Sequence, residues 1–155
     1  MSPAKDSPSL RLAVADRHAS VIWNGSLREG AGIMSTESGV LNDMQYSFRT
    51  RFLNDEKGTN PDELIAASLG GCFAMALANE LSLSGFHPEK IEARASATME
   101  NLPAGWTMTR IQLDVNADVP GVTHAEFMSA AMVAKTTCPV ARLLNTNISM
   151  TASLN

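Results

Sequence analysis

The chain has 155 residues, a formal net charge of −4 and a sequence pI near 5.3, with 45% hydrophobic and 18% charged residues. This length fits one compact domain. The twelve Lys and Arg residues are scattered, which excludes a nucleic-acid-binding surface built on clustered basic residues. The longest apolar stretches are interrupted before the ~18 residues that a membrane-spanning helix needs, so we expect a soluble protein with no membrane partner.

The N-terminal residues 1–10, MSPAKDSPSL, contain Pro, Ser and a Lys-Asp pair and predict a flexible tail ahead of a single domain at 11–155. Pro and Ser also stand where a signal peptide would have its apolar centre, so we expect a cytoplasmic protein. In that reducing compartment the two cysteines, Cys72 and Cys138, favour free or redox-active thiols over a permanent disulfide.

Residues 11–52 predict strands punctuated by turns: SVIWNG, GAGIMS, TESGVLNDMQ and YSFRTRF. In the last of these, Arg49 and Arg51 alternate with the aromatic residues Tyr46 and Phe48. Because side chains alternate between the faces of a strand, both arginines are expected on one face.

A long helix is predicted from Pro61 to about Ser84. Asn60 is a good N-cap, Pro61 suits the first helical position, and Glu63 stands where a capping-box acid belongs. Apolar residues cover most of the circumference of this helix, which is typical of a buried helix.

The second half of the chain predicts two long strands, a helix and a final strand. KIEARASATME and TMTRIQLDVNADV alternate apolar with polar residues around the loop NLPAGW, which indicates a hairpin. Thr123 caps a second apolar helix, Cys138-Pro139 interrupts it, and ISMTASL forms the last strand. The order of elements predicts an α+β domain with two long apolar helices packed on an antiparallel sheet.

The stretch SLGGCFAMA leaves two interpretations of Cys72 open. Cysteine is often a small buried residue, and Cys72 could fill space beside Gly70 and Gly71. Two glycines inside a helix cost roughly 1 kcal/mol each relative to alanine, so they indicate either close packing or access for a substrate to the sulfur.

Cys138 is expected at the N-cap of the turn that Pro139 opens, where a thiolate is favoured; the alternative is again a small buried residue. A thiolate reaction also needs a nearby cation. Arg51 is the leading candidate and Arg49 the second, and the alternative for both is a solvated strand face.

Several motifs occur together and in order: STESGVLN, FRTRF, EKGTNPDELIAA, GCFAMAL, PGV and CPVARLL. From about Trp23 to Ser153 the chain thereby resembles the OsmC/Ohr family of thiol peroxidases, and the OsmC branch most closely. The resemblance implies an intertwined α+β homodimer with two long helices per chain. It also implies that Cys72 is the peroxidatic cysteine, Cys138 the resolving cysteine and Arg51 the active-site arginine.

The family's active-site glutamate directly follows the proline of its motif, and here that residue is Asp62. The shorter side chain reaches ~1.5 Å less far, which can turn a direct hydrogen bond into a water-bridged one. The adjacent Glu63 is expected to fold back on the helix cap, so we prefer Asp62 as the partner of Arg51. Alternatively, both acids only complement the helix dipole.

Asp62 and Cys72 lie ten residues apart, ~15 Å along a straight helix. They cannot touch there. Either the helix bends near its two glycines, or a second chain brings the acid and the arginine to the sulfur.

The predicted function is therefore a cysteine-based peroxidase that reduces organic hydroperoxides, and hydrogen peroxide less well, through a Cys72 sulfenic acid and a Cys72–Cys138 disulfide. An external dithiol would recycle it, and no metal, haem or flavin cofactor is required. Apolar residues expected near the site are Leu69, Phe73 and Met75, and the alternative for all three is a place in the core. The alternatives are a non-catalytic homodimeric ligand binder or oxidant sensor that uses the same cysteines, and a thiol-disulfide oxidoreductase, which usually carries C-x-x-C.

Overall fold

The computed structural model describes residues 15–155, which divide into two compact units, one ending at Gly58 and the other spanning Thr59–Asn155. The predicted tail at 1–10 lies outside the described residues. That 11–155 forms a single domain stays a prediction, and the two units are described separately.

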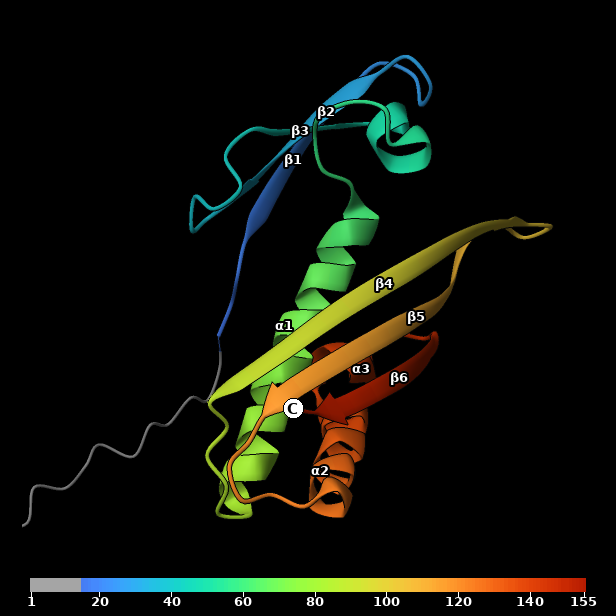
Figure 1. The fold of residues 1–155 in the computed structure, drawn as a ribbon. Coiled ribbons are helices and arrows are strands. Elements are labelled where there is room, and N and C mark those ends of the chain that lie inside the picture. The colour runs from blue at the N-terminus through green and yellow to red at the C-terminus, as the bar shows by residue number, and fades with distance from the viewer. Residues whose placement is uncertain (1–14) are drawn as a thin grey trace, which may run out of the picture. The chain divides into compact units, whose positions relative to one another are not determined.

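The N-terminal unit is a three-stranded antiparallel sheet of order β1-β2-β3 (Figure 1). Its strands are β1 (Ala19–Asn24), β2 (Ala31–Thr36) and β3 (Met44–Ser47). The rings of Trp23 and Tyr46 lie 5.4 Å apart across Gly32. A Cβ at Gly32 would stand 2.4 Å from the Tyr46 ring, so this ring contact requires glycine.

The strand predicted over YSFRTRF ends early, at Ser47, and Arg49–Leu53 forms one π-helical turn, η1. The turn is closed by the Asn54 N–H, which donates to the Arg49 carbonyl at 2.8 Å. Ser47 and Thr50 explain the change, because each backbone N–H donates to the other's hydroxyl oxygen, at 2.8 and 3.2 Å. Such local bonds compete with a strand ladder. The prediction that both arginines share a strand face was wrong.

The C-terminal unit contains three helices and three strands: α1 (Pro61–Leu83), β4 (Lys90–Leu102), β5 (Gly105–Asp118), α2 (His124–Thr137), α3 (Pro139–Leu143) and β6 (Asn147–Leu154) (Figure 1). Both predicted helix starts are confirmed. The Asn60 side chain accepts the Glu63 N–H at 2.9 Å, and Thr123 forms a reciprocal capping box with Glu126.

The sheet of this unit has the order β4-β5-β6 and is mixed. β4 and β5 form the predicted antiparallel hairpin, but β6 runs parallel to β5, with Ile148 opposite Ile111. The prediction of an entirely antiparallel sheet was wrong. The reason is the connection, since the chain returns through α2 and α3, and a crossover of this length joins parallel strands.

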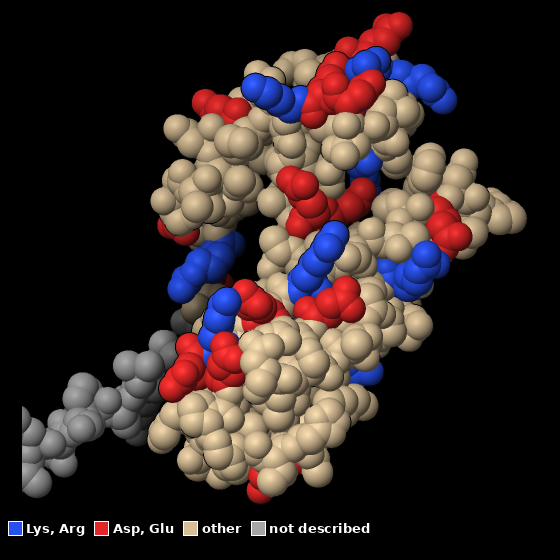
Figure 2. Space-filling model, viewed as in Figure 1, with Lys and Arg blue, Asp and Glu red and all other residues tan. Residues whose placement is uncertain are grey.

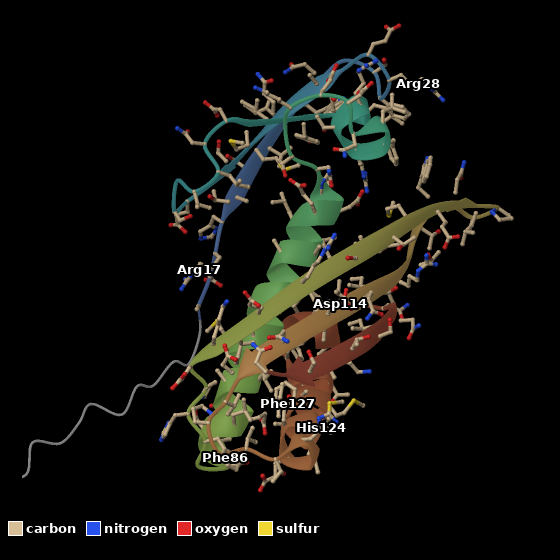
Figure 3. All side chains as sticks on the ribbon, viewed as in Figure 1. Arg17, Arg28, Phe86, Asp114, His124 and Phe127 are labelled. Atoms are coloured by element: carbon tan, nitrogen blue, oxygen red, sulfur yellow. The ribbon has the colours of Figure 1, made fainter. Side chains whose placement is uncertain are left out.

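The hydrophobic core lies between one face of this sheet and the helices. On β5, Ile111, Leu113 and Val115 are buried, whereas Asp114 between them is exposed on the opposite face. Figure 3 labels Asp114 on β5 and Phe127 on α2. The largest fully buried side chains are Phe73, Phe127, Leu69, Leu77, Leu81, Ile111, Leu113 and Cys138.

Helix α1 is buried on one side only, so the expectation of a helix buried all round was wrong for a single chain. Met75 is 77% and Leu83 75% exposed. Among the described residues α1 alone is long and apolar enough to cross a bilayer, a test that the core helix of a soluble protein also passes, and 28% of its most apolar window is buried. One face of α1 is therefore buried in the core, and the opposite face, which carries Met75, is uncovered in a single chain.

Charged side chains of both signs are interspersed on the surface. Figure 2 shows Lys and Arg next to Asp and Glu on the face in view, without a large basic patch. Lys90 and Glu92, for example, form an ion pair of 2.6 Å. This distribution gives no support to a phosphate-binding surface on that face.

Candidate active site

The two cysteines meet inside the C-terminal unit. Cys72 lies on α1, is partly buried and packs against the core, whereas Cys138 stands at the junction of α2 and α3 and is 0% exposed. The two thiols are close enough to affect each other's charge, and both are free. The fold thus places one thiol that reaches the surface against one that does not.

The chain geometry around Cys138 follows from the proline after it. The Cys138 N–H donates to the Ala134 carbonyl at 3.0 Å and closes α2. Pro139 has no N–H and disfavours helical geometry at the preceding residue, so α2 ends there and α3 begins with Pro139. The Cys138 sulfur accepts the N–H of Ala141 at 3.4 Å, in the predicted N-cap position.

The electrostatics of Cys138 differ from the expectation. Burial raises the pKa of the Cys138 thiol, and the hydrogen bond with Cys72 raises it further, while the backbone N–H groups of Ala141 and Val140 act in the opposite direction. The net pKa shift is upward, because loss of water around the sulfur outweighs the helix start. The backbone N–H groups at the helix start lower the pKa as predicted, but burial outweighs them, so the prediction that the thiolate is favoured overall was wrong.

The glycines before Cys72 are not explained by packing within the chain. A Cβ at Gly70 would lie 3.8 Å from Ala93 and Ala95 on β4, an ordinary van der Waals distance. A Cβ at Gly71 would meet nothing within 4 Å. Within one chain the side of α1 next to Cys72 is therefore open, which fits both access to the sulfur and close packing against a second copy.

The two candidate arginines are in the N-terminal unit. Arg49 forms ion pairs with Asp55 and, at 2.8 Å, with Glu56. Arg51 is exposed on η1, and its guanidinium carbon lies 5.2 Å from the centre of the Phe52 ring. Both arginines take part in interactions, and the action of either on Cys72 stays a prediction. The π-helical turn that carries Arg51 was missed, although the Ser-x-x-Thr spacing of its reciprocal bonds is visible in the sequence.

The two candidate acids stand in the first turn of α1. The Glu63 carboxylate accepts the hydroxyl of Thr59 at 2.7 Å, so it turns back toward the helix start, although its partner is the residue before the cap. Asp62 is partly buried. Because α1 is continuous from Pro61 to Leu83, the predicted alternative of a bent helix was wrong, and Asp62 stands ~15 Å from Cys72 of its own chain.

The three apolar residues expected beside the reactive sulfur differ in their burial. Leu69 and Phe73 are fully buried in the core, so the prediction that they line a substrate site was wrong. Met75 alone of the three is exposed. Within residues 15–155, no group of three or more His, Cys, Asp or Glu side chains is placed to hold a metal ion.

Comparison with known proteins gives consistent results. A family model described as OsmC-like protein matches residues 54–153. Peroxiredoxin OsmC of Escherichia coli K12 is 42% identical over 128 residues, which cover 83% of this chain and 89% of that protein. An organic hydroperoxide resistance protein of Xanthomonas axonopodis pv. citri is 29% identical over 102 residues, 63% of this chain and 67% of that one.

Solved structures share the fold at lower identity. An OsmC-like protein of unknown function from Vibrio cholerae has a TM-score of 0.73 and 15% identity, covering 90% of this chain and 100% of that one. The organic hydroperoxide resistance protein OhrB of Bacillus subtilis has a TM-score of 0.64 and 19% identity, over 89% and 98% of the two chains. The matched family model and the identity to peroxiredoxin OsmC show that this chain belongs to the OsmC/Ohr family.

Proposed function

We propose that this protein is a thiol-dependent peroxidase that reduces organic hydroperoxides, and hydrogen peroxide less well. The single observation that carries the proposal is the contact between a partly exposed thiol, Cys72, and a fully buried one, Cys138. A peroxidase of this type needs one sulfur that meets the substrate and a second that waits beside it. The names of its relatives, a peroxiredoxin and a hydroperoxide resistance protein, support the same chemistry.

In the oxidising half of the cycle, the Cys72 thiolate attacks one oxygen of ROOH. The O–O bond breaks, the alkoxide leaves and takes a proton from solvent to become ROH, and Cys72 becomes a sulfenic acid. The Cys138 sulfur then attacks this sulfenic acid, and water leaves with the thiol proton and the sulfenic oxygen. A Cys72–Cys138 disulfide results, which an external dithiol reduces. None of these steps requires a metal, haem or flavin.

Arg51 is assigned to hold the Cys72 sulfur in its anionic form, and Asp62 to orient Arg51. Both choices follow the motif positions of the OsmC/Ohr family, to which the chain belongs. Arg49 binds Asp55 and Glu56, and the Glu63 carboxylate accepts the Thr59 hydroxyl. A guanidinium beside a thiol favours its charged form, and a carboxylate holds the guanidinium by charge-assisted hydrogen bonds.

A homodimer completes this proposal. The uncovered face of α1 carries Met75 at 77% exposure, among small and polar residues, and burying this side chain against another surface would be stabilising. A second copy of the chain also supplies an Asp62 that is not held ~15 Å from this Cys72 by a shared helix. We place the cycle in the cytoplasm, whose reducing conditions keep both thiols reduced between oxidation events.

Peroxide-dependent disulfide formation in the purified protein tests the proposal. Reduced protein is mixed with one equivalent of cumene hydroperoxide, quenched with acid and digested, and the peptides are identified by mass spectrometry. The expected product joins the Cys72 and Cys138 peptides, and added dithiothreitol then sustains continuous hydroperoxide loss. A disulfide that forms without sustained turnover would instead indicate an oxidant sensor. Absence of any disulfide would rule out the peroxidase.

A further inference from the structure

The two sulfurs of the proposed disulfide differ sharply in accessibility. Cys138 is 0% exposed and belongs to the hydrophobic core, whereas Cys72 lies at the edge of that core and reaches the surface. All the cover over Cys138 comes from the chain itself. A second copy of the chain can add cover to Cys138 but cannot remove it.

Thiol-disulfide exchange depends on which sulfur the incoming thiolate can approach. The incoming, central and departing sulfurs line up, so the attacker reaches one sulfur from the side opposite to the other. Around Cys138 that space is filled by packed core side chains. Within one chain the α1 surface at Gly71, beside Cys72, is open, since a Cβ there would meet nothing within 4 Å. The homodimer proposed above covers α1 at Met75, one turn further on, and has to leave this approach to Cys72 open.

We propose that external thiols exchange only at the sulfur of Cys72, and that Cys138 is always the departing group. This inference rests on the disulfide of the proposed function and assigns the course of its reductive half. The thiolate RS⁻ forms a bond to Cys72, the Cys72–Cys138 bond breaks, and Cys138 leaves with the electron pair and takes up a proton. A second thiol of the reductant then attacks the mixed disulfide, which releases Cys72 and an oxidised reductant.

Leaving-group chemistry alone favours the opposite course. A sulfur leaves faster when the pKa of its thiol is lower, and burial raises the pKa of Cys138. A reductant guided by this preference would attack Cys138 and expel Cys72. Access to the attacked sulfur therefore outweighs the quality of the leaving thiolate, because the approach to Cys138 passes through the core.

Oxidation of the reduced protein by glutathione disulfide provides the test. By microscopic reversibility, this oxidation follows the same path as the reduction of the Cys72–Cys138 disulfide by glutathione, in the opposite direction. The rate of disulfide formation in the wild-type protein is compared with the rate of glutathione adduct formation in Cys138→Ser and Cys72→Ser. Intact mass and peptide mapping follow each reaction. The same reactions in guanidinium chloride provide the matched control, since unfolding removes the difference in access.

We expect Cys138→Ser to form its adduct at Cys72 at the wild-type rate, and Cys72→Ser to form one at Cys138 at least about tenfold more slowly. In guanidinium the two variants should react alike. Adduct formation in folded Cys72→Ser that equals or exceeds the wild-type rate would overturn the inference. Cys72→Ala repeats the comparison without a hydroxyl, and circular dichroism verifies the fold. No hydroperoxide takes part, so failure of this test and failure of the peroxidase assay are distinguishable.

Discussion

The side chain of Cys138 lies against that of Cys72 while having no contact with solvent. Helix α1 carries the partly exposed sulfur of Cys72, and the junction of α2 and α3 carries the fully buried sulfur of Cys138. This arrangement favours the protonated form of the Cys138 thiol and shields it from solvent. In the proposed cycle each cysteine therefore has a separate, measurable role.

The first prediction separates those roles by substitution. Cys72→Ser removes the sulfur that meets hydroperoxide, so dithiol-dependent consumption should fall by at least about a thousandfold. Cys138→Ser keeps the reactive sulfur and loses its partner, so it should consume one equivalent of hydroperoxide per chain and then stop or overoxidise. A ferrous oxidation assay with mass spectrometry of Cys72 measures both. Full turnover by Cys72→Ser would contradict the prediction.

The second prediction concerns the alkaline stability of the reduced protein. Burial raises the folded-state pKa of the Cys138 thiol above its ordinary value of 9.0, so the fold favours the protonated thiol. The associated stabilisation is complete below the unfolded-state pKa and is lost as the pH rises from about 9 through the folded-state pKa. In that window this thiol should contribute a slope of at most about 1.4 kcal/mol per pH unit to the free energy of unfolding.

Urea denaturation of the reduced protein from pH 7 to 10.5 measures this slope. Cys138→Ala is the matched control, because it keeps every other titrating group and removes only this thiol. Its overall stability will be lower, so the comparison is between slopes. Identical slopes in the two proteins would show that Cys138 does not titrate differently in the folded state.

The helices were predictable because their signals are local. Asn60 and Thr123 begin α1 and α2 as their capping patterns indicate, and Pro139 begins α3. The direction of β6 was not predictable in the same way. A strand of alternating apolar and polar residues has the same pattern in both directions. Whether β6 runs parallel or antiparallel to β5 is decided by how α2 and α3 pack on the sheet.

The candidate site also has a part that local sequence signals predict and a part that depends on tertiary packing. The sequence could indicate that Cys72 and Cys138 are worth attention, but only tertiary packing determines which of them is buried and hence which pKa rises. The aromatic alternation around Arg49 and Arg51 indicated a strand. The reciprocal hydrogen bonds of Ser47 and Thr50 form a turn there instead of a strand. Whether such local bonds prevail depends on the backbone hydrogen bonds that compete with them, which the sequence does not show.

The third prediction distinguishes the two acids at the start of α1. Asp62→Asn should lower the rate constant for hydroperoxide reduction about tenfold or more, because the proposed charge-assisted hydrogen bond to Arg51 would be lost. Glu63→Gln should leave that rate within about twofold and lower stability by ~0.5–1 kcal/mol, because its carboxylate serves Thr59 and the helix dipole. Stopped-flow kinetics and thermal unfolding report the two effects. The reverse pattern would transfer the catalytic role to Glu63.

The fourth prediction tests the homodimer at the uncovered face of α1. Met75→Glu places a charge where we expect apolar contact, and should raise the dimer dissociation constant at least about tenfold. Met75→Leu keeps an apolar side chain of similar volume and should leave the dimer intact. Sedimentation velocity over a range of protein concentrations compares the three proteins. A monomeric wild-type chain, or equal association of all three, would remove this face from the interface.

The fifth prediction follows from the position of Cys138 after a reductant has attacked Cys72. The freed Cys138 thiol still lies beside the mixed disulfide and can close the original bond again, in competition with the second step of reduction. A dithiol carries its second thiol on the same molecule, at high effective concentration, and so completes the reduction before reclosure. Glutathione has to supply a second molecule from solution. At equal thiol concentration, dithiothreitol should therefore sustain turnover at least about a hundredfold faster than glutathione. Measured with cumene hydroperoxide as oxidant, comparable rates for the two reductants would show that Cys138 does not compete for the mixed disulfide.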